Sequence, residues 1–308
     1  MDIGIGLPGM ASDHDPANFL DWAKLAESSG FSTLALVDRI VFPNYEPIVA
    51  FAAAAAVTTK IRLTTSILIG PYRLNTALLA KQLATLDRLS AGRLVVGIGI
   101  GARDDDYTAS GVEPRGRALR LEQQILELRA IWSGEVRGYA GAVGPTPCRP
   151  DGPEILVAGH VSDALRRAGR MGDGWMMGGG EPKQFQDMAK QVDKEWKINE
   201  REGFARTAAL ATFSLGPYAE ENARDFLGKY YDFPPDAGDQ ALIEASGAQN
   251  LAEAMLQDVA LNENQVAQLA DDWSVAGCDE LILLPCNDSL NQVTLLSHAL
   301  GERLVPRN

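Results

Sequence analysis

Three consecutive glycines, Gly178 to Gly180, could form an anion site, because they lie between an apolar run and a segment of helical periodicity. Backbone N–H groups in such a loop can approach a phosphate closely, and the amino end of a following helix favours negative charge. Taken alone the signal is weak, since any loop can contain three glycines. Two other groups at the ends of apolar runs could take part in chemistry: the pair Asp38-Arg39 and the charged run from Arg103 to Asp106.

Two further glycine patterns fit the dinucleotide-binding fingerprint: Gly4-x-Gly6-x-x-Gly9 and, loosely, Gly97-x-Gly99-x-x-Ala102. The fingerprint requires a strand before its first glycine and a helix that starts within it. Neither glycine pattern has both a preceding strand and a helix that starts within it. We interpret these glycines as places where a side chain or a ligand approaches a strand closely.

The few cysteines and histidines, which are the usual ligands of transition metals, do not indicate a metal site. The cysteines and histidines lie far apart and contain no CxxC pair or ligand spacing: Cys148, Cys278, Cys286, His14, His160 and His298. The sequence therefore predicts neither a metal site nor a disulfide framework.

The elements that would position these groups alternate regularly along the chain. Apolar, β-rich runs are predicted as strands at residues 3–7, 33–37, 62–69, 94–100, 154–158, 174–177, 208–215 and 280–284. Helical periodicity follows most of them, with Asp15-Pro16 and Asn75 as helix-start signals. Continuous apolar strands are typical of a parallel sheet covered on both faces. Eight such units favour an α/β fold with a closed (β/α)8 TIM barrel over an open doubly wound sheet.

We expect a single domain over residues 1–308, with a variable insertion region at about 217–279. Residues 101–114 and the glycine- and proline-rich residues 138–153 are predicted as loops. The aromatic residues Tyr230, Tyr231 and Phe233 in the insertion region form a candidate lid, with ordinary packing as the alternative.

Composition narrows the function classes. The formal net charge of −13 argues against a nucleic-acid partner. No apolar run reaches about 18 residues, so we expect no membrane span. The first residues read as a strand rather than a signal peptide, and a cytoplasmic location is expected.

Three blocks resemble the luciferase-like monooxygenase family in order and spacing: GFSTLALVDR (30–39), IRLTTSILIGPYRLNTALLAKQLATLDRLSAGRLVVGIGIG (61–101) and PEILVAGHVSDALRRAGRMGDGW (153–175). The resemblance implies a (β/α)8 barrel with insertions that binds FMN or coenzyme F420 at the carboxyl end of its strands. It also implies a non-prolyl cis peptide bond that supports the cofactor ring, at Ser66-Ile67.

The same resemblance implies which residues hold the cofactor. They are Ser66, Ile67, Gly99, Asp105, Ala158, Gly159, His160, Val161, Ser162, Gly178 and Gly179. Ser162 could cap a helix whose amino end favours an anion, and His160 could donate to a phosphate or merely cover the loop. An acidic run is usually a solvated face, so we expect one contact at most from Asp104 to Asp106. Tyr72 and Arg73 could line the substrate pocket.

Asp38 and Arg39 are the candidate catalytic residues. Arg39 could stabilise negative charge on a reduced ring, or could simply form a salt bridge with an acid. Some family members have histidine at the position of Arg39, and the F420-dependent sugar dehydrogenases have glutamate at that of Ala102. This chain lacks both, which argues against sugar dehydrogenation by that arrangement.

Three functions stay open. The first, which we favour, is a monooxygenase that uses reduced FMN and O2 on a small organic substrate and depends on a separate flavin reductase. The second is an F420-dependent oxidoreductase that transfers a hydride. The third is a catalytically silent flavin-binding or partner subunit. Family members are commonly dimeric, so a homodimer is expected.

Overall fold

The computed structural model describes residues 1–9, 17–235 and 237–304. Eight parallel strands in this part of the chain close into a barrel in the order β1-β10-β9-β8-β7-β4-β3-β2. They are β1 (Asp2–Gly6), β2 (Thr33–Leu36), β3 (Arg62–Ile69), β4 (Leu94–Gly99), β7 (Glu154–Ala158), β8 (Gly174–Met177), β9 (Arg206–Phe213) and β10 (Glu280–Pro285). The predicted TIM barrel is therefore confirmed, and the doubly wound alternative is wrong.

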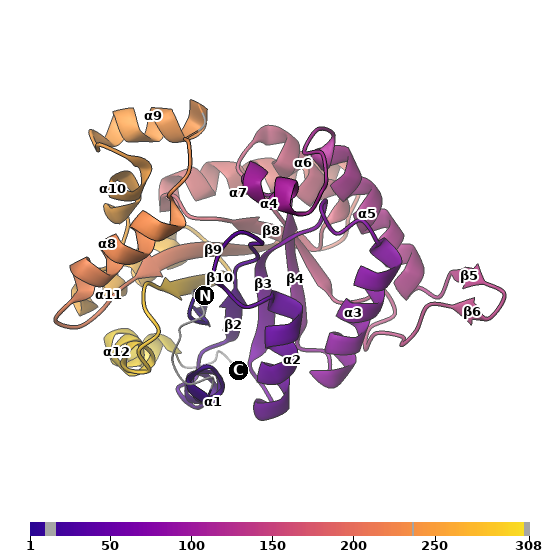
Figure 1. Ribbon diagram of the computed structural model, residues 1–308, viewed down its shortest axis with the longest axis horizontal. Coiled ribbons are helices and arrows are strands. Elements are labelled where there is room, and N and C mark those ends of the chain that lie inside the picture. The colour runs from indigo at the N-terminus through magenta and orange to yellow at the C-terminus, as the bar shows by residue number, and fades with distance from the viewer. Residues whose placement is uncertain (10–16, 236, 305–308) are drawn as a thin grey trace.

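Helices surround this barrel (Figure 1). Those that connect the strands or follow the last one are α1 (Ala17–Ser28), α2 (Pro47–Val57), α3 (Thr76–Leu89), α5 (Arg117–Trp132), α6 (Ser162–Met171), α7 (Pro182–Ile198), α11 (Glu263–Val275) and α12 (Asn291–Leu300). The short helix η1 (Gly301–Leu304) follows α12. Asn75 caps α3 as predicted, because its side chain accepts the N–H of Leu78 at 2.9 Å. The predicted helix-start signal at Asp15-Pro16 lies outside the described residues. So does His14, one of the three histidines.

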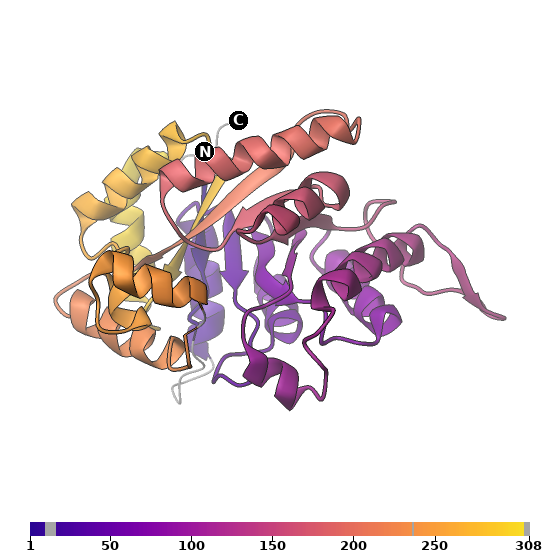
Figure 2. The ribbon, with the colours of Figure 1, turned by 90° about the horizontal axis from the view of Figure 1, so that it is seen from above.

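Two segments predicted as loops contain regular structure. Helix α4 (Asp104–Ala109) lies within residues 101–114, and the hairpin of β5 (Val136–Gly138) and β6 (Gly141–Ala142) overlaps the predicted loop 138–153. Three more helices follow β9, namely α8 (Ala219–Tyr230), α9 (Ala237–Ser246) and α10 (Leu251–Leu256). Figures 1 and 2 show α8 to α10 grouped on one side of the barrel, with the hairpin projecting on the other.

The barrel interior is filled by side chains. Ala35, Val95, Leu156, Ala158, Met176, Ala208, Leu210 and Ile282 form one buried cluster there. A Cβ on Gly97 would lie 2.1 Å from the carbonyl oxygen of Thr65, so glycine allows β3 and β4 to approach at this point. The glycines of β4 thus serve strand packing, as interpreted from the sequence, and not a dinucleotide loop. In the described residues, no helix is long and apolar enough to cross a membrane.

A network of charged side chains closes the amino-terminal end of the barrel. Each member is the first residue of its strand. Glu280 of β10 contacts Arg62 of β3 at 2.7 Å and also pairs with Arg206 of β9. Arg62 further contacts Asp2 of β1, and Arg206 contacts Glu154 of β7, each at 2.7 Å. Side chains at this amino-terminal face of a barrel generally serve stability, whereas function is found at the carboxyl ends of the strands.

Candidate active site

Asp38 follows β2 and joins it to the end of β3. Its carboxylate, 1% exposed, accepts the backbone N–H of Ile69 at 2.9 Å and is contacted by the Arg73 guanidinium at 3.1 Å. Arg73 also contacts Glu46, which caps α2, at 3.0 Å. Burial raises the pKa of Asp38, and the positive charge of Arg73 opposes that shift. Asp38 is thus a buried carboxylate that fixes the loops after two neighbouring strands.

The end of β3 carries the predicted cis peptide bond. The Ser66-Ile67 bond is cis, which confirms this prediction. The Ser66 hydroxyl is buried and has no hydrogen-bond partner among the described residues. Ile67 packs against β4, where a Cβ on Gly99 would lie 2.3 Å from its Cδ1 and 3.6 Å from the Cβ of Ala158. Ser66, Ile67, Gly99 and Ala158 therefore come together at the carboxyl ends of β3, β4 and β7.

The loops after β7 and β8 bring together the predicted phosphate residues. The carbonyl of Gly159 accepts the indole N–H of Trp175 from β8 at 2.9 Å. A Cβ on Gly178 would meet only His160, with Nε2 at 3.6 Å, and one on Gly179 would meet nothing within 4 Å. The two glycines therefore face open space beside the imidazole. Although more than a third of the surface of His160 is exposed, partial burial lowers the pKa of its imidazole.

One detail of this region differs from the prediction. Helix α6 begins at Ser162, and the residue in the N-cap position is Val161, which has no side-chain cap. The Ser162 hydroxyl therefore does not cap α6 in the predicted manner. Val161 has no group that can accept the free N–H groups of this exposed helix start, which leaves them for an anion, although Asp163 places a negative charge in the same turn.

Arg39 is held by two carboxylates of α4. Its Nε donates to Asp106 at 2.6 Å and its Nη2 donates to Asp105 at 3.2 Å. The other oxygen of Asp106 accepts the N–H groups of Ile40 and Val41 at 2.8 and 2.7 Å. The salt-bridge alternative for Arg39 is therefore present in the structure, and its catalytic role stays a prediction.

The sequence pattern of the luciferase-like monooxygenase family matches residues 3–279. The chain belongs to this family. Its members include oxidoreductases and monooxygenases, so this luciferase-like protein is an enzyme of that redox class.

Two relatives illustrate the range of the family. An uncharacterized protein of Mycobacterium tuberculosis (strain H37Rv) is 32% identical over 236 residues, which cover 67% of this chain and 80% of that protein. An F420-dependent glucose-6-phosphate dehydrogenase of Nocardia farcinica is 28% identical over 196 residues, with 58% of each chain covered.

Solved structures agree on the luciferase-like fold. An F420-dependent secondary alcohol dehydrogenase, bound to an F420-acetone adduct, superimposes with a TM-score of 0.78 at 17% identity and 100% coverage of both chains. The oxygenating constituent of 3,6-diketocamphane monooxygenase of Pseudomonas putida, in complex with FMN, gives 0.73 at 16% identity, with 100% of this chain and 98% of that chain covered. Both F420 and FMN thus occur among proteins that share this barrel.

The burial of Asp106 in this luciferase-like site was missed in the sequence. Asp106 is 4% exposed, because it holds Arg39 and the loop after β2, so the expectation that its acidic run is a solvated face is wrong there. Asp105 is 46% exposed and paired with Arg39, so its contact with a cofactor stays a prediction. Such long-range pairing leaves no signal in local spacing.

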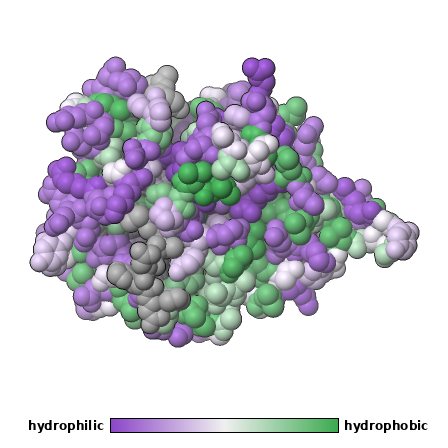
Figure 3. Space-filling model, in the orientation of Figure 1, coloured by the Kyte–Doolittle hydropathy of each residue, from purple (hydrophilic) through white to green (hydrophobic). Residues whose placement is uncertain are grey.

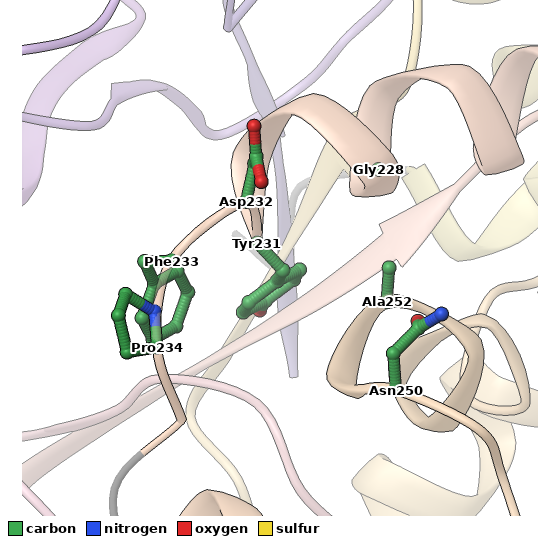
Figure 4. Close-up of a pocket in the computed structure, with 7 residues that line it drawn as sticks. All are labelled: Gly228, Tyr231, Asp232, Phe233, Pro234, Asn250 and Ala252. Atoms are coloured by element: carbon green, nitrogen blue, oxygen red, sulfur yellow. The ribbon is translucent and has the colours of Figure 1, made fainter.

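A cavity of about 580 Å³ lies in the predicted lid region (Figure 4). Its lining residues come from the end of α8, the following loop and the start of α10: Gly228, Tyr231, Asp232, Phe233, Pro234, Asn250 and Ala252. None of the predicted cofactor residues lines it. Tyr231 and Phe233 are thus brought to a cavity, whereas the cofactor residues gather at the barrel mouth.

Proposed function

We propose that this luciferase-like enzyme is a monooxygenase that uses reduced FMN and O2 on a small organic substrate. Reduced FMN supplies two electrons, and O2 supplies one oxygen atom to the substrate and one to water. The observation that favours a monooxygenase over a dehydrogenase is the pairing of Arg39 with carboxylates. It is bound to Asp105 and Asp106, and Ala102 stands at the position where sugar dehydrogenases of the family have glutamate. Such a site suits a reaction in which the protein need not supply a general acid or base.

The residues at the mouth fit a planar ring with a phosphate-bearing tail. Within the described part of the chain the buried Ser66 hydroxyl has no hydrogen-bond partner, and Gly99 leaves Ile67 room to support a ring. The open space at Gly178 and Gly179 allows backbone N–H groups to reach a phosphate, and the amino end of α6 favours its charge. In this proposal Ser66 and Ile67 orient the ring, while Gly159, His160 and Gly178 hold the phosphate.

The F420-dependent alternative is favoured by a separate observation. The Nocardia dehydrogenase and the secondary alcohol dehydrogenase described above are both named as F420-dependent. Hydride transfer from an alcohol requires a base for the hydroxyl proton. Asp38 has the raised pKa that such a base needs, but its carboxylate is occupied by Arg73 and Ile69.

Titration of the purified protein with FMN, anaerobically reduced FMN and F420, followed by ring absorbance, tests the choice. We expect saturable binding of reduced FMN that is tighter than binding of F420, and protein-dependent oxygen uptake when a flavin reductase supplies reduced FMN. Tighter binding of F420, without such oxygen uptake, would establish the alternative. A folded protein that binds neither cofactor would contradict both and leave the role of silent partner subunit.

We also propose that a second copy of the chain covers α2. This helix contains no polar or charged residue, and Val49, Ala53 and Ala56 are exposed along one side of it. Val49 is 71% exposed, and Leu78 and Leu119 are 51% and 60% exposed in the first turns of the neighbouring helices α3 and α5. Figure 3 shows hydrophobic residues gathered over α2. A helix that is apolar on all sides is normally buried.

Sedimentation equilibrium tests this proposal. We expect a species of twice 33.1 kDa for the natural chain, and a monomer for Val49→Glu, because the new carboxylate would be buried at the interface. Val275→Glu is the matched control, since Val275 is 83% exposed on α11, away from this surface. A natural chain that is monomeric at micromolar concentration would show that the proposed interface does not exist.

A further inference from the structure

Arg103 has a setting unlike that of the other arginines at the barrel mouth. Arg39 and Arg73 contact carboxylates within 3.2 Å, and Arg117 contacts Asp104 at 3.5 Å. Among the described residues, no carboxylate lies within 4.0 Å of Arg103. Its Nη2 donates to the carbonyl of Tyr230 at 3.2 Å, while its Nη1 is buried without a hydrogen-bond partner in the same part of the chain.

Aromatic rings hold this guanidinium in place. Its Cζ lies 3.2 Å from the ring centroid of Phe233, 5.3 Å from that of Tyr230 and 5.5 Å from that of Tyr231. Tyr230 also packs on Phe42 from the loop after β2, with ring centroids 5.3 Å apart. Arg103 therefore extends from the end of β4 to the end of α8, over the mouth of the barrel. A planar guanidinium fixed on aromatic rings presents its remaining N–H groups in a defined direction.

Arg103 is only partly buried, but a cation that is shielded from water on one side without a counter-ion still loses solvation, and a hydrogen-bonded anion offsets that loss. Burial lowers the pKa of Arg103, and the neighbouring charge of Arg39 acts in the same direction. Asp105 is near enough to oppose this shift, but its carboxylate is paired with Arg39. An arginine fork with a free N–H group is the usual partner of a carboxylate or a phosphate.

We propose that Arg103 binds an anionic oxygen group of a ligand at the barrel mouth through its guanidinium. This proposal rests on the proposed function for the identity of that ligand, and it gives the substrate class: a small organic acid whose carboxylate contacts Arg103. A phosphate of the cofactor has the same chemistry, so the experiment must separate the two sources.

The first measurement is calorimetric titration of the cofactor-free protein with sodium phosphate and with sodium acetate, at constant ionic strength. We expect saturable binding of at least one of them, weakened about tenfold or more in Arg103→Met, because one charge-assisted hydrogen bond is lost. Arg224→Met is the matched control. It removes a positive charge from α8, at a side chain that is 54% exposed and paired with Glu220, and should leave anion binding unchanged.

A second variant separates anion binding from a purely structural contact. Phe233→Leu removes the ring beneath the guanidinium but keeps the charged donor, and should weaken anion binding by less than Arg103→Met does. The proposal is wrong if the natural chain binds neither anion saturably, if Arg103→Met binds as well as the natural chain, or if Phe233→Leu and Arg103→Met lose binding equally.

A comparison of FMN with riboflavin, which lacks the phosphate, identifies the source of the anion. If Arg103 contacts a substrate carboxylate, Arg103→Met should bind FMN normally, and acetate should still bind to the FMN-loaded natural chain. If it contacts the cofactor phosphate, Arg103→Met should lose the preference for FMN over riboflavin. Because the acetate and phosphate titrations need no redox cofactor, failure of the proposed function leaves their result interpretable.

Discussion

Gly178→Asp is expected to weaken FMN binding by 100-fold or more, on the order of 3 kcal/mol, while the barrel stays folded. The new carboxylate would lie in the loop proposed to hold the phosphate, so two negative charges would meet at short range. The fold should tolerate the change, since a Cβ at this position meets only His160 at 3.6 Å. Flavin fluorescence titration measures the binding, and circular dichroism measures the fold.

Two variants separate charge from bulk in this experiment. Gly178→Ala adds only a methyl group in open space and should bind FMN within a few-fold of the natural chain. Gly138→Asp adds the same charge on the exposed hairpin and should have no effect. Unchanged affinity in Gly178→Asp would mean that the phosphate is held elsewhere in the molecule.

The barrel was predictable because each of its strands is a short apolar run bounded by polar or glycine residues. Runs such as 62–69 and 94–100 are too short for a typical helix and rich in β-branched residues, so local sequence was sufficient to predict strands. The family resemblance added the Ser66-Ile67 cis bond, which no propensity could indicate.

The details of the site were less predictable because they depend on partners distant in sequence. Asp106 stands in an acidic run that resembles a solvated surface, yet it accepts hydrogen bonds from residues 39–41, more than sixty positions away. Arg103 depends in the same way on Tyr230 and Phe233. At Ser162 the prediction was wrong by one residue, within the ordinary uncertainty of helix ends.

Glu280→Gln is expected to lower the free energy of unfolding by about 2–4 kcal/mol, measured by urea denaturation. Its carboxylate is 1% exposed and accepts from Ser32 at 2.6 Å and Arg62 at 2.7 Å, and it also pairs with Arg206. Glutamine keeps the shape but leaves two partly exposed guanidinium groups without this buried counter-charge. The loss stays below that of a wholly unpaired charge, because Arg62 retains Asp2 and Arg206 retains Glu154.

Asp2→Asn is the matched control, because it removes a different carboxylate from the same Arg62. Asp2 is 44% exposed, so solvent screens this pair and the expected loss is about 0–1 kcal/mol. Equal losses in the two variants would show that burial at the closed end of the barrel does not strengthen the network. Neither change should alter FMN or anion binding, because Glu280 and Asp2 begin strands whose opposite ends form the mouth. Stability and ligand binding can therefore be changed separately, since one depends on charges at the first residues of the strands and the other on loops beyond their last residues.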